Sequence, residues 1–295
     1  MIITPASRAR AAELIGSYQI QGANDQLLKS FEVDDDTVRY AIILSLGQVK
    51  IPSNLPVILK TWNNTNELEG IRKNALKALG YFNSDEAVTT LISELSKNSS
   101  LDIVIPALGM TGSPKAAEPL LNMIKSGSNS DLSALALTNL KIPSTYPVIV
   151  DILKQKLTDY SFDKTMIVFV ELLAAENYTP AQDIIAKIYL FSSEFSEISP
   201  VAKAALKRMN LKQAYCIVTA TALNLRDNPN TRSSITGLLN TGEMATILEA
   251  TPIKYTIDNK QDYWYKVKSE KGNIGWVYGG YLKKLDPSDL TNIVK

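Results

Sequence analysis

Two residue types that carry much of enzyme chemistry are scarce in this 295-residue sequence. Histidine is absent, which removes the commonest general base, the commonest metal ligand and every nucleophile that depends on an imidazole. Cys216 is the sole cysteine, so neither an intramolecular disulfide nor a cysteine cluster for zinc can form. Its place in the apolar stretch from Tyr215 to Val218 predicts a buried strand residue. We therefore expect no enzymatic activity, no metal and no cofactor.

Two other segments look like ligand motifs, and both have a simpler structural interpretation. "GMTGSPKAAE", from Gly109, is rich in glycine but lacks the Lys-Ser/Thr ending of a phosphate-binding loop. Three aspartates, Asp34 to Asp36, open a predicted helix, where free backbone amides and the helix dipole favour negative charge. We interpret the first as a turn between helices and the second as helix capping, not as a calcium site.

The charge balance argues against a nucleic acid partner. The sequence has 31 basic and 30 acidic residues, a formal net charge of +1. Residues 1–212 carry 21 basic and 22 acidic side chains, hence −1, and the remaining 10 basic and 8 acidic residues give residues 213–295 a charge of +2. Neither part has the excess of positive charge that binding to a phosphate backbone or an anionic membrane needs.

No segment has the pattern of a membrane span or a secretion leader. The most apolar run, "MIVFVELLAA", is interrupted by Glu171, well short of the roughly 18 apolar residues of a spanning helix. The start of the sequence carries Arg8 and Arg10 where a leader would need apolar residues. We expect a cytoplasmic location, or a periplasmic or cell-envelope location if a leader was removed ahead of residue 1.

A short apolar segment recurs through residues 1–212. Its marker, an aliphatic residue followed by glycine or a substitute, returns after 31, 33, 29, 32 and 33 residues, at Ile15-Gly16, Leu46-Gly47, Leu79-Gly80, Leu108-Gly109, Leu140-Lys141 and Leu173-Ala174. We expect the four glycines to close helices in the left-handed conformation.

Each marker is followed by a capping or proline signal and a second apolar helix, so that each repeat is a helix pair. In the third repeat two matching apolar stripes are predicted, one on each helix: Ile71, Ala75, Ala78, Leu79, and Val88, Leu91, Ile92, Leu95. Because one pair cannot cover both stripes, successive pairs must stack. The sequence predicts six pairs, with "PVAKAALKRM" as a closing helix.

Over residues 6–212 these repeats resemble the HEAT and armadillo class of helical repeats. "DDDTVRYAIILSLG" and "GIRKNALKALG" are the most similar, with Arg39 and Arg72 at the family's arginine position. Later repeats lack that arginine. The resemblance implies an α-solenoid with an extended surface that docks a protein; a non-repetitive helical bundle is the alternative.

After residue 213 the apolar period changes to two, and turn signals such as "NTGE" and "EKGN" become frequent. Five short strands fit the pattern, with "YLKKL" as a further short pairing, near residues 215–220, 235–239, 244–249, 263–268 and 274–278. About seventy residues of this kind predict a small closed or half-open barrel.

Residues 218–285 resemble a bacterial SH3 domain, through "ALNLRDNP", "GLLNTGEMATIL", "YWYKVK" and "GNIGWVYGGYL" in that order. Two features depart from the family pattern: Asp227-Asn228 replace the usual Ser-Gly, and the connection Thr251 to Asp262 is unusually long. Domains of this family bind ligands and do not catalyse. The resemblance therefore implies a module that binds a peptide or a peptidoglycan fragment.

The same resemblance places a ligand groove, with Trp264, Tyr278 and Tyr281 at its floor and Asn224 and Arg226 on one wall. Aromatic faces offer a rigid, partly apolar surface to proline rings or sugars, and arginine can hold a carboxylate. For the aromatic residues the alternative is a place in the core, which we expect for Trp276. For Arg226 the alternative is a structural ion pair.

We expect the long connection, Thr251 to Asp262, to form the opposite wall and to narrow the groove. Pro252, Ile253 and Tyr255 are its apolar residues and are expected to fold over the aromatic floor, whereas Asp258, Lys260 and Asp262 are expected to stay solvated.

The sequence thus predicts an α + β multidomain protein: a HEAT-like solenoid at residues 1–212, an SH3-like barrel at 213–286 and a tail at 287–295. A non-enzymatic adaptor is the function we expect, with a protein partner on the solenoid and a peptide or peptidoglycan in the barrel. The alternatives are a repeat enzyme of the alkylpurine glycosylase type acting on nucleic acid, and a cytoplasmic scaffold whose barrel is purely structural.

Overall fold

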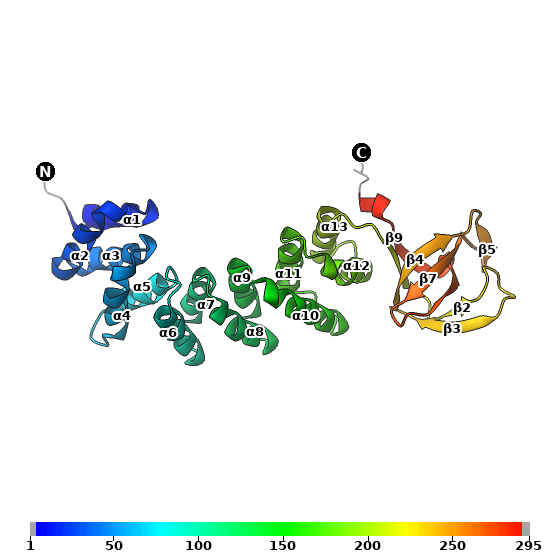
Figure 1. Cartoon of the computed structure of the whole chain (residues 1–295), viewed down its shortest axis with the longest axis horizontal. Helices are drawn as coiled ribbons and strands as arrows, with labels where there is room; N and C mark the ends of the chain where they lie inside the picture. The colour runs from blue at the N-terminus through cyan, green and yellow to red at the C-terminus, as the bar shows by residue number, and fades with distance from the viewer. Residues whose placement is uncertain (1–3, 291–295) are drawn as a thin grey trace. The chain divides into compact units, whose positions relative to one another are not determined.

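The computed structural model describes residues 4–290 and contains, within them, thirteen α-helices followed by nine β-strands (Figure 1). This confirms the predicted class, helix-pair repeats followed by an SH3-like β domain. The chain divides into two compact units, Met1–Thr145 and Tyr146–Lys295. None of the described helices is both long enough and apolar enough to cross a membrane.

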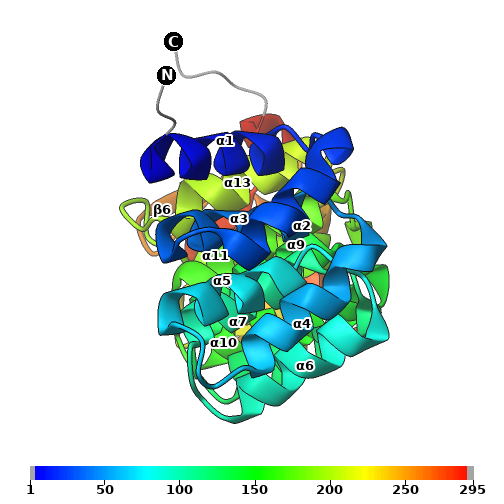
Figure 2. The same ribbon diagram turned by 90° about the vertical axis from the view of Figure 1, so that its left-hand side faces the viewer.

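The first unit consists of stacked helix pairs. Its α-helices are α1 (Pro5–Ser17), α2 (Asn24–Val33), α3 (Asp36–Gln48), α4 (Leu55–Asn63), α5 (Glu69–Leu79), α6 (Asp85–Ser96), α7 (Leu101–Met110), α8 (Ala117–Lys125) and α9 (Ser130–Leu140). The first helices of successive pairs contact one another, α1 with α3, α3 with α5, α5 with α7 and α7 with α9. Figure 2 shows α1, α3, α5 and α7 in this succession.

The predicted stripes of the third repeat form its core. Ile71, Ala75, Ala78 and Leu79 on α5 are at most 1% exposed, and Val88, Leu91 and Leu95 on α6 are buried. Only Ile92 of the eight predicted residues is half-buried. The register of the repeat is therefore the one that the sequence indicates.

None of the four marker glycines has the left-handed conformation, so the prediction that they close helices in that way was wrong. Gly16, Gly47 and Gly109 lie inside helices, and Gly80 has φ −59°. A side chain on them would collide with the next repeat: a Cβ on Gly47 or Gly80 would lie 2.8 Å from a backbone oxygen of Ala78 or Ala107. Glycine is present because two helices approach closely there, as at other positions where backbones come together.

Arg39 and Arg72 join one helix pair to the next. Arg39 Nε donates to the carbonyl oxygen of Phe31 at 3.2 Å, and Arg72 Nε donates to that of Trp62 at 3.0 Å. Each guanidinium also lies over the ring of the same residue, 5.0 Å from the Phe31 centroid and 4.8 Å from the Trp62 centroid. The arginine thus satisfies a free carbonyl at the end of the preceding helix and stacks on an aromatic ring.

The second unit begins with helices α10 (Tyr146–Thr158), α11 (Lys164–Ala175), α12 (Gln182–Phe191) and α13 (Ile198–Arg208). The last of these is the predicted closing helix, and it packs against α11 and α12. Its apolar side includes Ala202 and Leu206, both fully buried.

A seven-stranded antiparallel sheet follows, in the order β3-β2-β8-β7-β4-β1-β9, with β5 and β6 as a separate hairpin. The strands are β1 (Ala214–Val218), β2 (Ala222–Arg226), β3 (Ile235–Asn240), β4 (Met244–Ala250), β5 (Tyr255–Ile257), β6 (Lys260–Asp262), β7 (Trp264–Ser269), β8 (Ile274–Tyr278) and β9 (Leu282–Leu285). The five predicted strands correspond to β1, β3, β4, β7 and β8. Strand β9 is the further pairing expected at "YLKKL", whereas β2 and the hairpin strands were missed.

The core of the sheet is small and aliphatic, consisting of Cys216, Val218, Leu223, Leu225, Leu239, Ala245, Val267 and Val277. Cys216 is fully buried, as predicted. Trp276 is half-buried and lies outside this core, contrary to our expectation. Strand alternation explains the difference, because Gly275 and Val277 are the buried positions on either side of it.

Within the second unit, helix α12 contacts strands β1 and β9. Tyr215 on β1 donates a hydrogen bond to Asp183 at 2.5 Å. Lys283 on β9 donates to the carbonyl oxygens of Leu190 and Ser192, at 2.7 and 3.1 Å, at the end of α12. The predicted boundary near residue 213 remains a prediction about independent folding.

The predicted tail, 287–295, is described only to residue 290. Its described part, Pro287–Leu290, is a 3₁₀ helix that packs against α13, and Leu290 is buried.

Cys216 provides a probe of the stability of the sheet. Burial of its thiol raises the pKa to about 12, so neither access nor ionisation favours reaction in the folded state. We expect a thiol reagent at pH 8 to modify Cys216 only under conditions that unfold the second unit. Labelling in native buffer at the rate of an unfolded-chain control would contradict the buried position.

Candidate functional site

All five predicted ligand-binding residues line one groove of the β domain. The groove has a volume of about 520 Å³ and is bordered by Asn224, Arg226, Trp264, Tyr278 and Tyr281, together with Ala220, Ala222, Leu223, Thr231, Ile257 and Asp258. The five residues thus lie together, beside Thr231 and Ile257, which the sequence did not single out, and their role in ligand binding stays a prediction.

One wall is formed by strand β2. Leu223 and Leu225 point into the core, and the alternation of the strand places Asn224 and Arg226 on its outer face. Arg226 Nη1 donates to the carbonyl oxygen of Ser233 at 2.7 Å, and no ion pair of Arg226 is found among residues 4–290. The guanidinium is thus anchored through one nitrogen, and its other N–H groups are available to a ligand.

The aromatic floor is deeper than expected. Trp264 and Tyr278 are each 3% exposed, with ring centroids 5.6 Å apart. Tyr281 is half-buried, and its ring meets that of Tyr278 edge-on at 6.1 Å. Tyr281 is therefore the floor residue with most surface for a ligand, whereas the other two chiefly support it.

The hairpin β5-β6 forms the opposite wall through its backbone and polar side chains. The hydroxyl of Tyr278 accepts from the Asp262 N–H at 3.0 Å, and it lies 2.6 Å from the carbonyl oxygen of Tyr255, to which it can donate. Tyr281 donates its hydroxyl hydrogen to Asp258, an interaction that raises the pKa of Tyr281. The ammonium of Lys260 lies 4.2 Å from the centroid of the Tyr281 ring.

These contacts correct one part of our expectation for the connection Thr251 to Asp262: Asp258 and Lys260 stay exposed, as predicted, but they and not the apolar residues contact the floor. Asp258 and Lys260 contact the aromatic residue Tyr281, whereas Ile253 is 60% exposed. The cause is the hairpin itself, whose turn residues Asp258 and Asn259 have φ 51° and 61°. This is the backbone of a two-residue type I′ turn, which directs the tip of the hairpin onto the groove.

The β2 wall continues onto the edge strand β3. Leu238 lies opposite Asn224, and Ile235 lies opposite Arg226. Both aliphatic side chains are more than half exposed. An apolar ridge therefore adjoins the polar wall of the groove.

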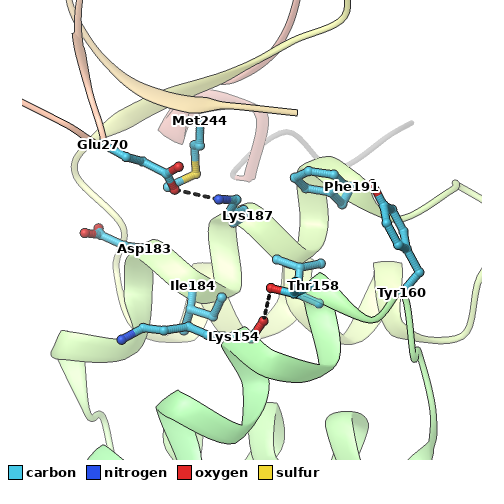
Figure 3. Close-up of a pocket in the computed structure, with 10 residues that line it drawn as sticks. Lys154, Thr158, Tyr160, Asp183, Ile184, Lys187, Phe191, Met244 and Glu270 are labelled. Carbon is cyan, nitrogen blue, oxygen red and sulfur yellow. Dashed lines mark hydrogen bonds and ion pairs between the residues drawn. The ribbon is translucent and has the colours of Figure 1, made fainter. Parts of the chain in front are cut away.

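A second cavity in this unit, about 600 Å³ in volume, lies where α10 and α12 meet the sheet (Figure 3). The rings of Tyr160 and Phe191 meet edge-on at 6.3 Å. Lys187 and Glu270 form an ion pair of 2.7 Å across it. Since this pairing joins helix to sheet, we interpret the cavity as part of their packing.

A known protein family matches the β domain in sequence. Residues 221–283 match the family described as "Bacterial SH3 domain", which confirms the predicted family for this segment. No curated protein matches the chain.

Among solved structures, the chain is similar to one in the complex of CpcE and CpcF of phycocyanin lyase from Nostoc sp. PCC7120. The sequence identity is 17%, the TM-score 0.38, and the match covers 69% of this chain and 89% of the other. Residues 4–212 form helical repeats, as their own helix pairs show.

Proposed function

We propose that the protein is a non-enzymatic adaptor, in which the helical repeats dock a partner protein and the SH3-like domain binds a peptide or a peptidoglycan fragment. The observation that supports it best is the groove, where one half-exposed tyrosine, an anchored arginine and an amide side chain converge. Such a set offers a rigid ring for stacking and charged hydrogen bonds for a carboxylate or peptide carbonyl.

A peptide ligand has additional support from the surface beside the groove. Ile235 and Leu238 extend the Arg226 and Asn224 wall as exposed aliphatic side chains. A peptide with apolar side chains can use this ridge, whereas a glycan would leave it uncovered. A peptidoglycan stem peptide would meet the same requirement, and its binding would also imply a location in the cell envelope.

Calorimetric titration of the full chain with soluble peptidoglycan fragments and with proline-rich peptides tests the proposal. We expect saturable binding to one class, weakened roughly tenfold or more by Asn224→Ala or Arg226→Ala, because each removes a hydrogen bond to ligand. Lys268→Ala is the matched control, since Lys268 is exposed on β7 and does not line the groove.

Equal affinities of the three variants would place the ligand elsewhere, and no binding to either class would favour a purely structural barrel. Salt-sensitive binding to duplex DNA at low ionic strength would instead support the repeat enzyme acting on nucleic acid.

A further inference from the structure

Three successive repeats of the first unit carry an arginine seven residues before the marker, at Arg8, Arg39 and Arg72. Arg8 forms an ion pair of 2.6 Å with Asp34, and Arg39 forms one with Glu67. Each of these acids belongs to the segment that leads into the following repeat. Arg72 has no carboxylate within ion-pair distance in the part of the chain that the structure describes.

The segment that follows Arg72 toward the next repeat supplies no acidic partner, and this segment lies in the shortest interval between markers, the 29 residues from Leu79 to Leu108. Helices α3 and α5 begin at Asp36 and Glu69, each ten residues before the marker at Leu46 or Leu79. Helix α7 begins at Leu101, only seven residues before Leu108. The first turn of that helix is absent, and the segment before it is a short turn that ends in Ser99 and Ser100.

The shortened segment leaves a pocket of about 590 Å³ beside Arg72, which we call the Arg72 pocket and which includes Trp62, Arg72, Lys97, Ser99 and Ser100. The Arg72 guanidinium lies over the Trp62 ring, and Arg72 Nε donates a hydrogen bond to the carbonyl oxygen of Trp62. The two terminal nitrogens are therefore fixed in orientation and available for a two-pronged contact with a carboxylate.

Three carboxylates and three cations line this pocket, and each carboxylate has an ion-pair partner. Glu67 pairs with Arg39, Glu69 with Lys73 at 2.6 Å, and Glu94 with Lys97 at 2.6 Å. Arg39 also pairs with Asp36 and does not line the pocket, so the lining is neutral as a whole, and Arg72 is its one cation without an ion pair among the described residues. The complementarity is therefore local: the Arg72 guanidinium, and not the charge of the whole pocket, favours a carboxylate from outside the chain.

We propose that the Arg72 pocket binds an acidic side chain of a partner protein, whose carboxylate takes the place that Asp34 and Glu67 have beside Arg8 and Arg39. The inference rests on the proposed adaptor function and gives the chemistry of its helical docking surface. A free small carboxylate would not be retained, because a single solvent-accessible ion pair contributes little affinity. A protein side chain is held by the surrounding contacts as well.

The test uses the full chain and a short capped peptide of alternating Glu and Ser, with a Gln and Ser peptide of equal length as control. We expect saturable binding of the acidic peptide that shifts the Arg72 Nε–Hε NMR signal. The wild-type chain should bind the Gln peptide roughly ten- to hundredfold more weakly than the acidic peptide. The Arg72→Ala variant should bind the acidic peptide more weakly than the wild type by a similar factor. No binding, or equal binding by Arg72→Ala, would overturn the proposal, and binding of free acetate with equal affinity would assign the pocket to small carboxylates.

Ser99→Glu provides a second test that does not require Arg72 to be removed. Its carboxylate should occupy the open position, raise the melting temperature and block the acidic peptide, whereas Ser99→Gln should do neither. The rise should disappear in an Arg72→Ala background. Equal effects of the Glu and Gln variants would contradict the assigned site. Titration of the groove ligand in parallel distinguishes failure of this pocket from failure of the adaptor proposal, because these variants leave the groove intact.

Discussion

Replacement of Gly109 by valine is expected to destabilise the first unit by about 3 kcal/mol or more. A Cβ at this position would lie 2.6 Å from the Cα and 2.7 Å from the carbonyl oxygen of Ala136 on α9. The obstructing atoms are backbone, so relief requires α7 and α9 to move apart and to lose their packing. Urea unfolding of the full chain, followed by circular dichroism, measures the effect.

Two variants define what this result means. Gly22→Ala is the control, because a Cβ there has no neighbour within 4 Å and Gly22 does not have positive φ. Leu108→Ala, at the fully buried residue next to Gly109, should cost about 2–5 kcal/mol by leaving a cavity. A Gly109→Val variant as stable as Gly22→Ala would show that α7 and α9 are not in close contact.

The register of the repeats was predictable, but the role of its glycines was not. Spacing of Leu46, Leu79 and Leu108 identifies which residues face inward, since burial follows the helical period. A glycine after such a leucine is compatible both with a left-handed helix end and with close helix packing. Only the positions of Ala78 and Ala107 in the next repeat distinguish them, and these depend on how the pairs stack.

In the groove, too, local sequence patterns predicted some features, whereas the tertiary contacts were not predictable. Family resemblance was enough to bring Asn224, Arg226 and Trp264 to one site. It did not predict that the hairpin would contact Tyr281 through Asp258 and Lys260. Composition predicted correctly that Asp258 and Lys260 stay exposed, but it does not show that a tyrosine hydroxyl and ring offer this carboxylate and this ammonium specific partners. The Asp258-Asn259 turn was the available signal for this hairpin.

Replacement of Thr251 to Asp262 by a four-residue turn is expected to lower the affinity of the groove for its ligand by roughly a hundredfold. The hairpin supplies one wall, at Ile257 and Asp258, and its backbone covers Tyr278. Without it, Trp264 and Tyr278 would gain solvent, and Tyr281 would lose the carboxylate and ammonium that orient its ring. Loss of a preorganised wall of a binding site commonly removes a few kcal/mol of binding energy.

A finer variant separates the presence of the hairpin from its attachment. Tyr278→Phe keeps the ring and removes the hydroxyl, which leaves the Asp262 N–H without this acceptor and should cost about 1–3 kcal/mol of hairpin anchoring. We expect its affinity to fall between those of the wild type and the shortened chain, in calorimetric titrations with the same peptidoglycan fragments and peptides. Unchanged affinity and selectivity after shortening would refute the role as a wall. Binding that appears only after shortening would mean that the hairpin covers the groove as a lid, because Tyr278 would then hold it over the ligand surface and not beside it.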